Sequence, residues 1–256
     1  MGIGDDIIWL GEAWHRYQTG GVKSRPTRDG VPHGFKEAWA NCDYVDMLNG
    51  VPLEERTQGV RPYAASTDYR CRPARFVLST EEQLQADVFY NNEPYWLICA
   101  DVKQRLHYKN KDWGWSNWVG LAGLIRQHRP QQRLVRLHPP TSVIQIEGVE
   151  NRRCLSVRDM ITLSSKASLT ITTEGAWHHI AAAHNIPAVV LYGHCTSPVP
   201  SQRHNHSGTG YLGQLNITSD LGPCYDTQGT CTICPEVWRE ITPELVYERI
   251  EQYVRT

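Results

Sequence analysis

The sequence predicts an α/β protein built on a parallel sheet. Residues 95–100 form a continuous apolar run, which is typical of a strand buried on both faces. The segment 117–128 then places Trp118, Leu121, Leu124 and Ile125 on one helical stripe. Segments with strand and helix character continue to alternate as far as residue 254. This alternation favours a parallel sheet with helices on both faces.

The elements that we expect follow from apolar periodicity and from end signals. Before residue 92, a helix is expected over residues 7–18, behind a glycine-rich start, and another over 79–89. Ser79 and Glu82 are spaced as a capping box for that second helix. The later strands are expected at 95–100, 133–137, 143–146, 168–172 and 187–192, and the later helices at 117–128, 156–166, 175–184 and 242–254. Ser156 with Asp159, and Thr242 with Pro243, are start signals for two of these helices.

The turn-forming segment Asn91-Asn92-Glu93-Pro94 is the expected domain boundary. It divides the chain into a small unit over residues 1–92 and a larger α/β unit over residues 93–256. Two α/β units that face each other form a cleft, which is the usual place for a ligand.

Charge and hydropathy exclude several classes of protein. The 256 residues carry a formal net charge of −1, so a protein that coats DNA through a general basic excess is excluded. No apolar run approaches the roughly 20 residues of a membrane span. The start of the sequence has no basic and apolar leader, and a cytoplasmic location is therefore expected.

The eight cysteines fall into two groups. Five are scattered, several in apolar surroundings, and we expect reduced thiols there: Cys42, Cys71, Cys99, Cys154 and Cys195. Cys224, Cys231 and Cys234 are clustered, and the last two have C-x-x-C spacing. This cluster is a candidate structural zinc site that needs one further ligand. Three free thiols, or one disulfide, are the alternatives.

The first candidate site is the start of the chain, where Gly2 and Gly4 precede Asp5 and Asp6. Glycines let a backbone approach a ligand closely, and a helix start favours an anion or a polarised oxygen. A carboxylate in such a loop can act as a general base. The alternative is that Asp5 or Asp6 only caps the following helix.

The second candidate site is the segment that begins at Lys111, between an expected strand and an expected helix. Ligands of α/β proteins bind at the carboxyl ends of strands, and a lysine there suits phosphate oxygens. Trp113 and Trp118 belong to the same segment. The alternatives are that the tryptophans anchor the core and that Lys111 is a solvated surface charge.

The third candidate site is the turn from the strand ending near Thr172 into the helix starting near Gly175. Amides of Gly175 and Ala176 would point out of the helix start and form a diphosphate site. Glu174 could accept hydrogen bonds from sugar hydroxyls. His178 and His179 diverge by about 100° on a helix, which argues against one shared metal. The alternative for each histidine is a satisfied, buried side chain.

These segments together resemble glycosyltransferase family 9, the ADP-heptose heptosyltransferases. Lys111, Trp113 and Trp118 have the family's K-x-W-x(4)-W spacing, and Gly4-Asp5 is similar to its N-terminal G-D pair. The stretch from Glu174 through His178, His179 and Ile186-Pro187-Ala188-Val189-Val190-Leu191-Tyr192-Gly193 resembles its C-terminal motif. The three matches occur in family order along nearly the whole chain.

The resemblance implies a GT-B fold, in which two Rossmann-like domains face each other across a cleft. It implies an enzyme that transfers a sugar from a nucleotide-sugar donor to an acceptor hydroxyl, with inversion and without a metal or other cofactor. Asp5 would be the catalytic base, and Gly4 would lie beside the donor. Lys111 would contact the donor diphosphate, which the backbone of Gly175, Ala176 and Trp177 would cradle, and Glu174 would hold the donor sugar. His178 and His179 fall in the same donor motif.

The chain departs from the family in its N-terminal part. No strand precedes the glycine-rich start, and the N-terminal unit has about half of the usual length. The acceptor therefore stays open. The candidates are a glycan, a lipopolysaccharide, a lipid-linked sugar and a hydroxymethylated DNA base. The last would suit a phage enzyme that acts in the cytoplasm of its host. The alternative function is a non-catalytic module that binds a nucleotide or a sugar through the donor site alone. The oligomeric state is not encoded in any pattern that we recognise.

The tail cysteines give a first testable prediction. If Cys224, Cys231 and Cys234 hold zinc, the purified protein contains about one zinc ion per chain, and Cys231→Ser lowers stability more than it lowers activity. Elemental analysis and thermal unfolding measure the two effects. If the purified protein contains no zinc, free thiols or one disulfide are the remaining alternatives for these cysteines.

Overall fold

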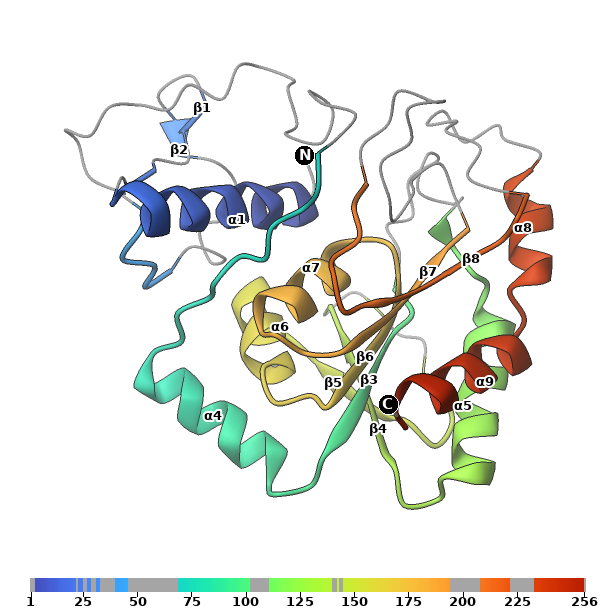
Figure 1. The fold of residues 1–256 in the computed structure, drawn as a ribbon. Coiled ribbons are helices and arrows are strands. Elements are labelled where there is room, and N and C mark those ends of the chain that lie inside the picture. The colour runs from blue at the N-terminus through green and yellow to red at the C-terminus, as the bar shows by residue number, and fades with distance from the viewer. Residues whose placement is uncertain are drawn as a thin grey trace.

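The computed structural model describes residues 3–21, 23–24, 27–28, 31–32, 40–45, 69–101, 111–139, 142, 145–193, 208–221 and 233–255. Before residue 92 its elements are α1 (Ile3–Gly20), β1 (Thr27–Arg28), β2 (Val31–Pro32) and α4 (Thr80–Tyr90). After it come β3 (Tyr95–Cys99), α5 (Trp115–His128), β4 (Arg133–His138), β5 (Glu150–Arg153), α6 (Val157–Ser164), β6 (Leu169–Thr173), α7 (Ala176–Ala183), β7 (Ala188–Tyr192), β8 (Leu215–Thr218), α8 (Cys234–Glu240) and α9 (Pro243–Tyr253) (Figure 1). None of these described helices is both long enough and apolar enough to cross a membrane.

A six-stranded parallel sheet organises the fold, with strand order β5-β4-β3-β6-β7-β8. The chain starts in the middle at β3, builds outward through β4 and β5, and then returns to add β6, β7 and β8 on the other side. This is the doubly wound order of Rossmann-type sheets. The predicted α/β class is thus confirmed, and β3 and β6 flank the point where the strand order reverses.

Helices cover both faces of the sheet because its central strands are buried on both sides. All five residues of each of β3, β6 and β7 are buried. Alternate residues of β3 face opposite layers: Tyr95 and Leu97 pack in a core with α1, α6 and α7, whereas Trp96 and Ile98 pack with α5, α8 and α9. The continuous apolar run at 95–100 is therefore explained by burial on two faces.

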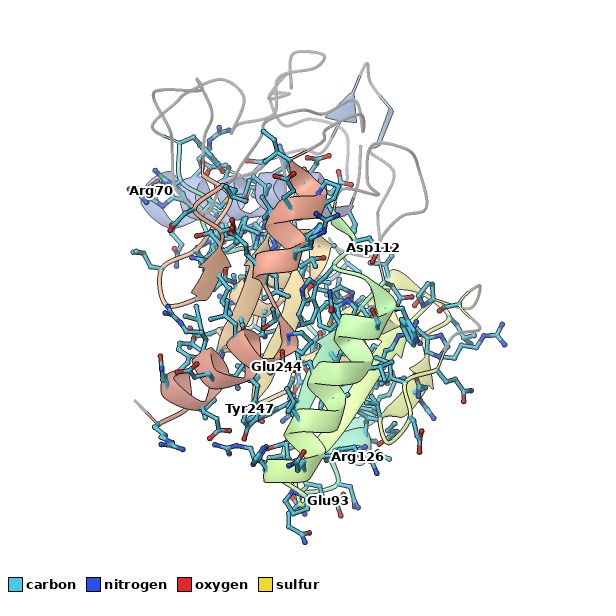
Figure 2. The ribbon with its side chains drawn as sticks, turned by 90° about the vertical axis from the view of Figure 1, so that its right-hand side faces the viewer. Arg70, Glu93, Asp112, Arg126, Glu244 and Tyr247 are labelled. Carbon is cyan, nitrogen blue, oxygen red and sulfur yellow. The ribbon has the colours of Figure 1, made fainter. Side chains whose placement is uncertain are left out.

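Helices α5 and α9 lie against each other on one face of the sheet (Figure 2). Trp118, Leu121 and Ile125 on the predicted stripe of α5 are buried in this core. At the end of α5, the ring of His128 stacks on Tyr247 of α9 with centroids 5.2 Å apart. The predicted helix over 117–128 is confirmed and begins two residues earlier.

Helices α1 and α4 precede residue 92, but both pack against helices that cover the parallel sheet. Ile7 and Leu10 of α1 are fully buried in the same core as Tyr95 and Trp177. Helix α4 lies against α6, where Arg158 pairs with Glu82. The division into domains at residue 92 stays a prediction, and the strands described before it are the two-residue pair β1 and β2.

The predicted helix starts are confirmed in detail. Ser79 and Glu82 form a reciprocal capping box at α4, and Ser156 and Asp159 form another at α6. At α9, Thr242 accepts a hydrogen bond from the amide of Leu245, and Pro243 occupies the first helical position. Short polar motifs therefore located these helices correctly.

The predicted start of the first helix is wrong. Helix α1 begins at Ile3, so Gly4, Asp5 and Asp6 form its first turn and are not a loop that precedes it. Glycine disfavours a helix interior, but acidic residues in the first turn favour a helix through its dipole. A Cβ at Gly4 would lie 3.2 Å from the ring of His179, so the glycine permits close packing of α1 on α7.

Other elements also differ from expectation. The strand predicted at 143–146 is wrong for Gln145 and Ile146, which lie outside any strand. The strand that pairs with β4 comes later, at β5, and its exposed polar residues give no apolar alternation. Strand β8 and helix α8 were not predicted. Helix α8 also explains the glycine after β7, because a Cβ at Gly193 would lie 2.4 Å from the ring of Trp238.

Candidate functional site

The candidate site lies where the strand order reverses, at the carboxyl ends of β3 and β6. These strands are parallel neighbours with Cys99 opposite Thr172, so the segments that follow them emerge side by side. Lys111 lies in the segment after β3, and Glu174 follows β6 directly. The Lys111 ammonium donates a hydrogen bond to Glu174 Oε2 and forms an ion pair with it. Two residues predicted separately for the donor site are thus brought together.

This ion pair is largely shielded from solvent. The side chains of Lys111 and Glu174 are 17% and 8% exposed. The negative charge of Glu174 acts on its surroundings, since it raises the pKa of the Cys71 thiol and the Tyr192 hydroxyl beyond the larger effect of their burial. A charge held in such a place interacts with a ligand far more strongly than a surface charge does.

His178 is held at the start of α7 by two main-chain partners. Its Nδ1 accepts a hydrogen bond from the Gly175 amide at 3.0 Å, and its Nε2 lies 3.0 Å from the Thr209 carbonyl oxygen. The first contact needs a lone pair on Nδ1 and the second needs a proton on Nε2, which fixes a neutral tautomer. Burial lowers the pKa of His178, which also favours the neutral ring.

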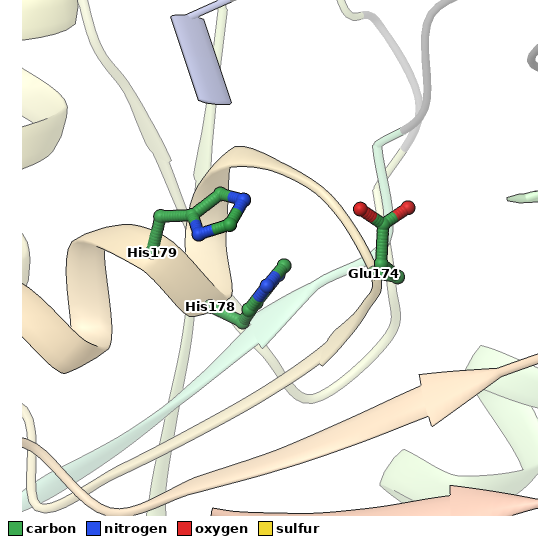
Figure 3. Close-up of side chains that lie close together, drawn as sticks. All are labelled: Glu174, His178 and His179. Carbon is green, nitrogen blue, oxygen red and sulfur yellow. The ribbon is translucent and has the colours of Figure 1, made fainter. Parts of the chain in front are cut away.

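His179 is the second buried histidine of the motif. Its Nδ1 lies 2.7 Å from the hydroxyl of Tyr211, and burial lowers its pKa far below the usual value. The rings of His178 and His179 lie close together, with centroids 3.8 Å apart and planes tilted by 40° (Figure 3). Although the two residues diverge on the helix, rotation about the side-chain bonds brings the rings together, and the expectation against one shared metal stays a prediction.

Among the described residues, Glu174, His178 and His179 have potential ligand atoms within 4.8 Å of one another and could hold a metal ion. The hydrogen bonds decide how well this cluster suits a cation. Both nitrogens of His178 are engaged by the main chain, so binding a metal through this ring would break one of those bonds. These contacts therefore agree with the alternative interpretation of His178 as a buried side chain whose two ring nitrogens are both hydrogen-bonded.

The amide of Gly175 is not available to a ligand in this arrangement, because it donates to His178. The prediction that it would cradle a diphosphate stays a prediction, and this amide would first have to leave His178. The ring of His178 caps the start of α7, where a diphosphate was expected. The next amides, at Ala176 and Trp177, belong to the first turn of α7, where the helix itself supplies no acceptor. The Trp177 side chain points the other way, into the core.

The first turn of α1 contacts this same region. Gly4 lies against the His179 ring and the Cα of Ala176, so the starts of α1 and α7 meet. Asp5 is half-buried beside this contact, whereas Asp6 is fully buried. The packing of two helices, distant in sequence, therefore brings the turn that carries Asp5 to the start of α7.

The tryptophans of the second motif are core anchors, as the alternative reading held. Trp113 and Trp118 are 2% and 1% exposed and meet edge to face, with ring centroids 4.9 Å apart. The indole of Trp113 donates to the carbonyl of Ile241. These contacts fix the segment that carries Lys111 to the α5 layer of the sheet.

Two residues of the site were not predicted from the sequence. Thr209 and Tyr211 precede β8 and hold the two histidines, but neither stands in a recognisable motif.

Cys224 and Cys231 lie outside the described residues, so the zinc prediction is not tested. Cys234 is buried at the start of α8. Four other cysteines are buried thiols without a disulfide: Cys42, Cys71, Cys99 and Cys154.

Comparison with known proteins gives structural similarity without sequence similarity. No family model matches the chain, and no curated protein matches its sequence. The ADP-heptose lipopolysaccharide heptosyltransferase II of Escherichia coli is 16% identical, with a TM-score of 0.50 over 70% of this chain and 53% of that one. A family 9 glycosyl transferase from Veillonella parvula is 14% identical, with a TM-score of 0.52 over 71% of this chain and 53% of that one.

The fold is GT-B-like. The mixed α/β architecture and the six-stranded parallel sheet match these glycosyltransferases, and the partial coverage fits a reduced domain. The chain spans about half the length of these two structures. The predicted GT-B-like α/β fold is thereby confirmed, whereas two domains that face each other across a cleft stay a prediction.

Buried histidines give a prediction about pH. Burial lowers the pKa of His184 to about 4, despite a hydrogen bond to the Ile161 carbonyl, and the unfolded chain has the ordinary value near 6.5. Between these values the unfolded state binds more protons, so the free energy of unfolding falls as pH falls, by about 1.4 kcal/mol per pH unit for each such histidine.

Denaturant unfolding at pH 7, 6 and 5 measures this effect. We expect a smaller loss over this range for His184→Gln than for the unaltered protein, even though the variant is less stable at pH 7. Equal losses in the two proteins would show that His184 is not neutral in the fold.

Proposed function

We propose that the chain is an inverting glycosyltransferase that uses a nucleotide-sugar donor and needs no metal for transfer. The observation that carries this proposal is the shielded Lys111–Glu174 pair at the switch point of a GT-B-like sheet. Ligands of doubly wound sheets bind at this crevice. The pair offers a cation for a diphosphate and a carboxylate for sugar hydroxyls.

The donor side of the proposed reaction rests on Lys111 and the start of α7. As the bond from the anomeric carbon to the diphosphate breaks, its electron pair goes to the phosphate oxygen. Lys111 and the amides of Ala176 and Trp177 would stabilise the charge that develops there. Glu174 would accept hydrogen bonds from the sugar.

The acceptor side rests on Asp5. The acceptor oxygen forms a bond to the anomeric carbon from the face opposite the leaving diphosphate, and its proton passes to the Asp5 carboxylate. The contact of Gly4 with Ala176 and His179 supports this assignment, because it joins the turn that carries Asp5 to the proposed donor site.

Donor turnover with and without acceptors tests the function. The donor panel includes ADP-heptose, which two solved structures of this fold type name, and uridine and guanosine diphosphate sugars. The acceptor panel includes a lipopolysaccharide core, a glycan, a lipid-linked sugar and DNA with hydroxymethylated bases. Release of nucleoside diphosphate that depends on one acceptor supports the transferase. Donor binding without turnover would support the non-catalytic module.

Lys111→Ala is expected to weaken donor binding and to leave the fold intact. Loss of one charge-assisted contact to a diphosphate lowers affinity by about 10- to 150-fold, which calorimetry with the donor measures. Lys166→Ala is the matched control, because Lys166 pairs with Asp87 at an exposed position. A donor dissociation constant that Lys111→Ala leaves unchanged would refute the role of Lys111.

Asp5→Asn is expected to lower the transfer rate by roughly 10²–10⁴-fold, with donor affinity nearly unchanged, because a general base acts only as the proton leaves. Asp6→Asn is the control in the same helical turn. Asp6 lies in the first turn of α1, where its charge favours the helix dipole, so its change is expected to lower the free energy of unfolding by about 1 kcal/mol or less and to affect the rate little. The reverse pattern, with Asp6 essential and Asp5 dispensable, would move the base by one residue.

A further inference from the structure

The Lys111–Glu174 pair places an anion where the proposed function has to bind another anion. Glu174 Oε2 accepts a hydrogen bond from the Lys111 ammonium, which is the cation proposed to meet the diphosphate. A bound diphosphate therefore shares this ammonium with a carboxylate. Both side chains are shielded from water, so the repulsion between the two anions is only weakly screened.

The main chain holds Glu174 in this position. It follows β6 directly, and its amide donates to the Leu191 carbonyl of β7 at 3.1 Å. The next residue, Gly175, is tied to the ring of His178. The segment is thus bonded on both sides of the carboxylate, and a bound anion meets the charge of Glu174 rather than displacing its backbone.

The neighbouring histidines do not cancel this charge. His178 and His179 have their ligand atoms within 4.8 Å of those of Glu174. Burial lowers the pKa of both rings, and the two main-chain partners of His178 fit only its neutral form. Neither ring therefore supplies a positive charge at neutral pH.

We propose that Glu174 is a specificity-determining residue that makes this site select a sugar-bearing diphosphate over a bare diphosphate, and that it thereby promotes release of the nucleoside diphosphate after transfer. The inference rests on the proposed function. It assigns to the carboxylate a second role, repulsion of the product, beside the binding of the sugar.

The charge and the hydrogen bonds of the ligand change together during the reaction. While the sugar is attached, its hydroxyls donate to Glu174 and offset the repulsion, and the phosphate that carries the sugar is a diester with a single negative charge. After transfer the sugar leaves with the acceptor, and the freed phosphate oxygen gains a negative charge. Glu174 then loses the hydrogen bonds from the sugar hydroxyls, keeps the one from Lys111, and faces a more negative ligand, so the affinity of the product falls.

Calorimetric binding of inorganic pyrophosphate tests the inference, because pyrophosphate has the charge of the product and no sugar. We expect Glu174→Gln to bind pyrophosphate about 10-fold or more tightly than the unaltered protein, since a like charge a few ångströms away is removed from a shielded site. Glu174→Asp keeps the charge and is expected to bind pyrophosphate as weakly as the unaltered protein does. A merely structural role would weaken binding in both variants.

Glu150→Gln is the matched control for the change in net charge. Glu150 also pairs with a basic residue, Arg133. It is the first residue of β5, so it lies at the amino ends of the parallel strands, opposite the carboxyl ends where the candidate site lies. Its substitution is expected to leave pyrophosphate binding unchanged. An equal gain of affinity in Glu150→Gln and Glu174→Gln would overturn the inference, because the effect would then come from net charge alone.

Two further outcomes separate this inference from the proposed function. Pyrophosphate binding that depends on Lys111 but is unchanged by Glu174→Gln would overturn the inference and leave the proposed donor site standing. Absence of millimolar binding in the unaltered protein, Glu174→Gln and Lys111→Ala alike would overturn both, because no diphosphate site would exist at Lys111.

Discussion

Burial of β3 on both faces is the constraint on which the rest of the structure depends. Its residues contribute alternately to two cores, one with α1, α6 and α7 and the other with α5, α8 and α9. Because β3 pairs with both β4 and β6, it also sets where the strand order reverses. The candidate site follows from that position, since Lys111 and Glu174 come from the segments after β3 and β6.

Hydrogen bonds of buried neutral groups fix the site around the charged pair. His178 ties the start of α7 to Thr209, and Gln214 donates to the carbonyl of His178 at 2.9 Å. Tyr211 meets His179 in the same way. Polar groups buried at this depth are costly unless they are bonded, so each of these contacts restrains the segment before β8 against α7. The ionic and neutral parts of the site thus have separate tasks, one available to a ligand and one holding the shape.

The sequence allowed prediction wherever a local pattern has a physical cause. The apolar run of β3 and the capping residues Ser79 and Ser156 act within a few residues, and their elements were located correctly. Strand β5 could not be found because it is an exposed edge strand of polar residues, defined only by pairing with β4. The role of Tyr211 was equally hidden, since it depends on a contact with His179 across 32 residues. Lys111 and Glu174 were identified separately, but their pairing required the sheet.

The meeting of two helix starts explains why acidic residues gather around this site. Gly4 in the first turn of α1 contacts Ala176, the first residue of α7, so the partially positive ends of both helices point into one region. Asp5 and Asp6 lie in the first turn of α1, and Glu174 directly precedes Gly175 at the start of α7. Carboxylates interact favourably with helix starts, so both first turns suit the acidic residues that they carry. The same packing that sets Gly4 against His179 also brings the turn that carries Asp5, the proposed general base, to the start of α7.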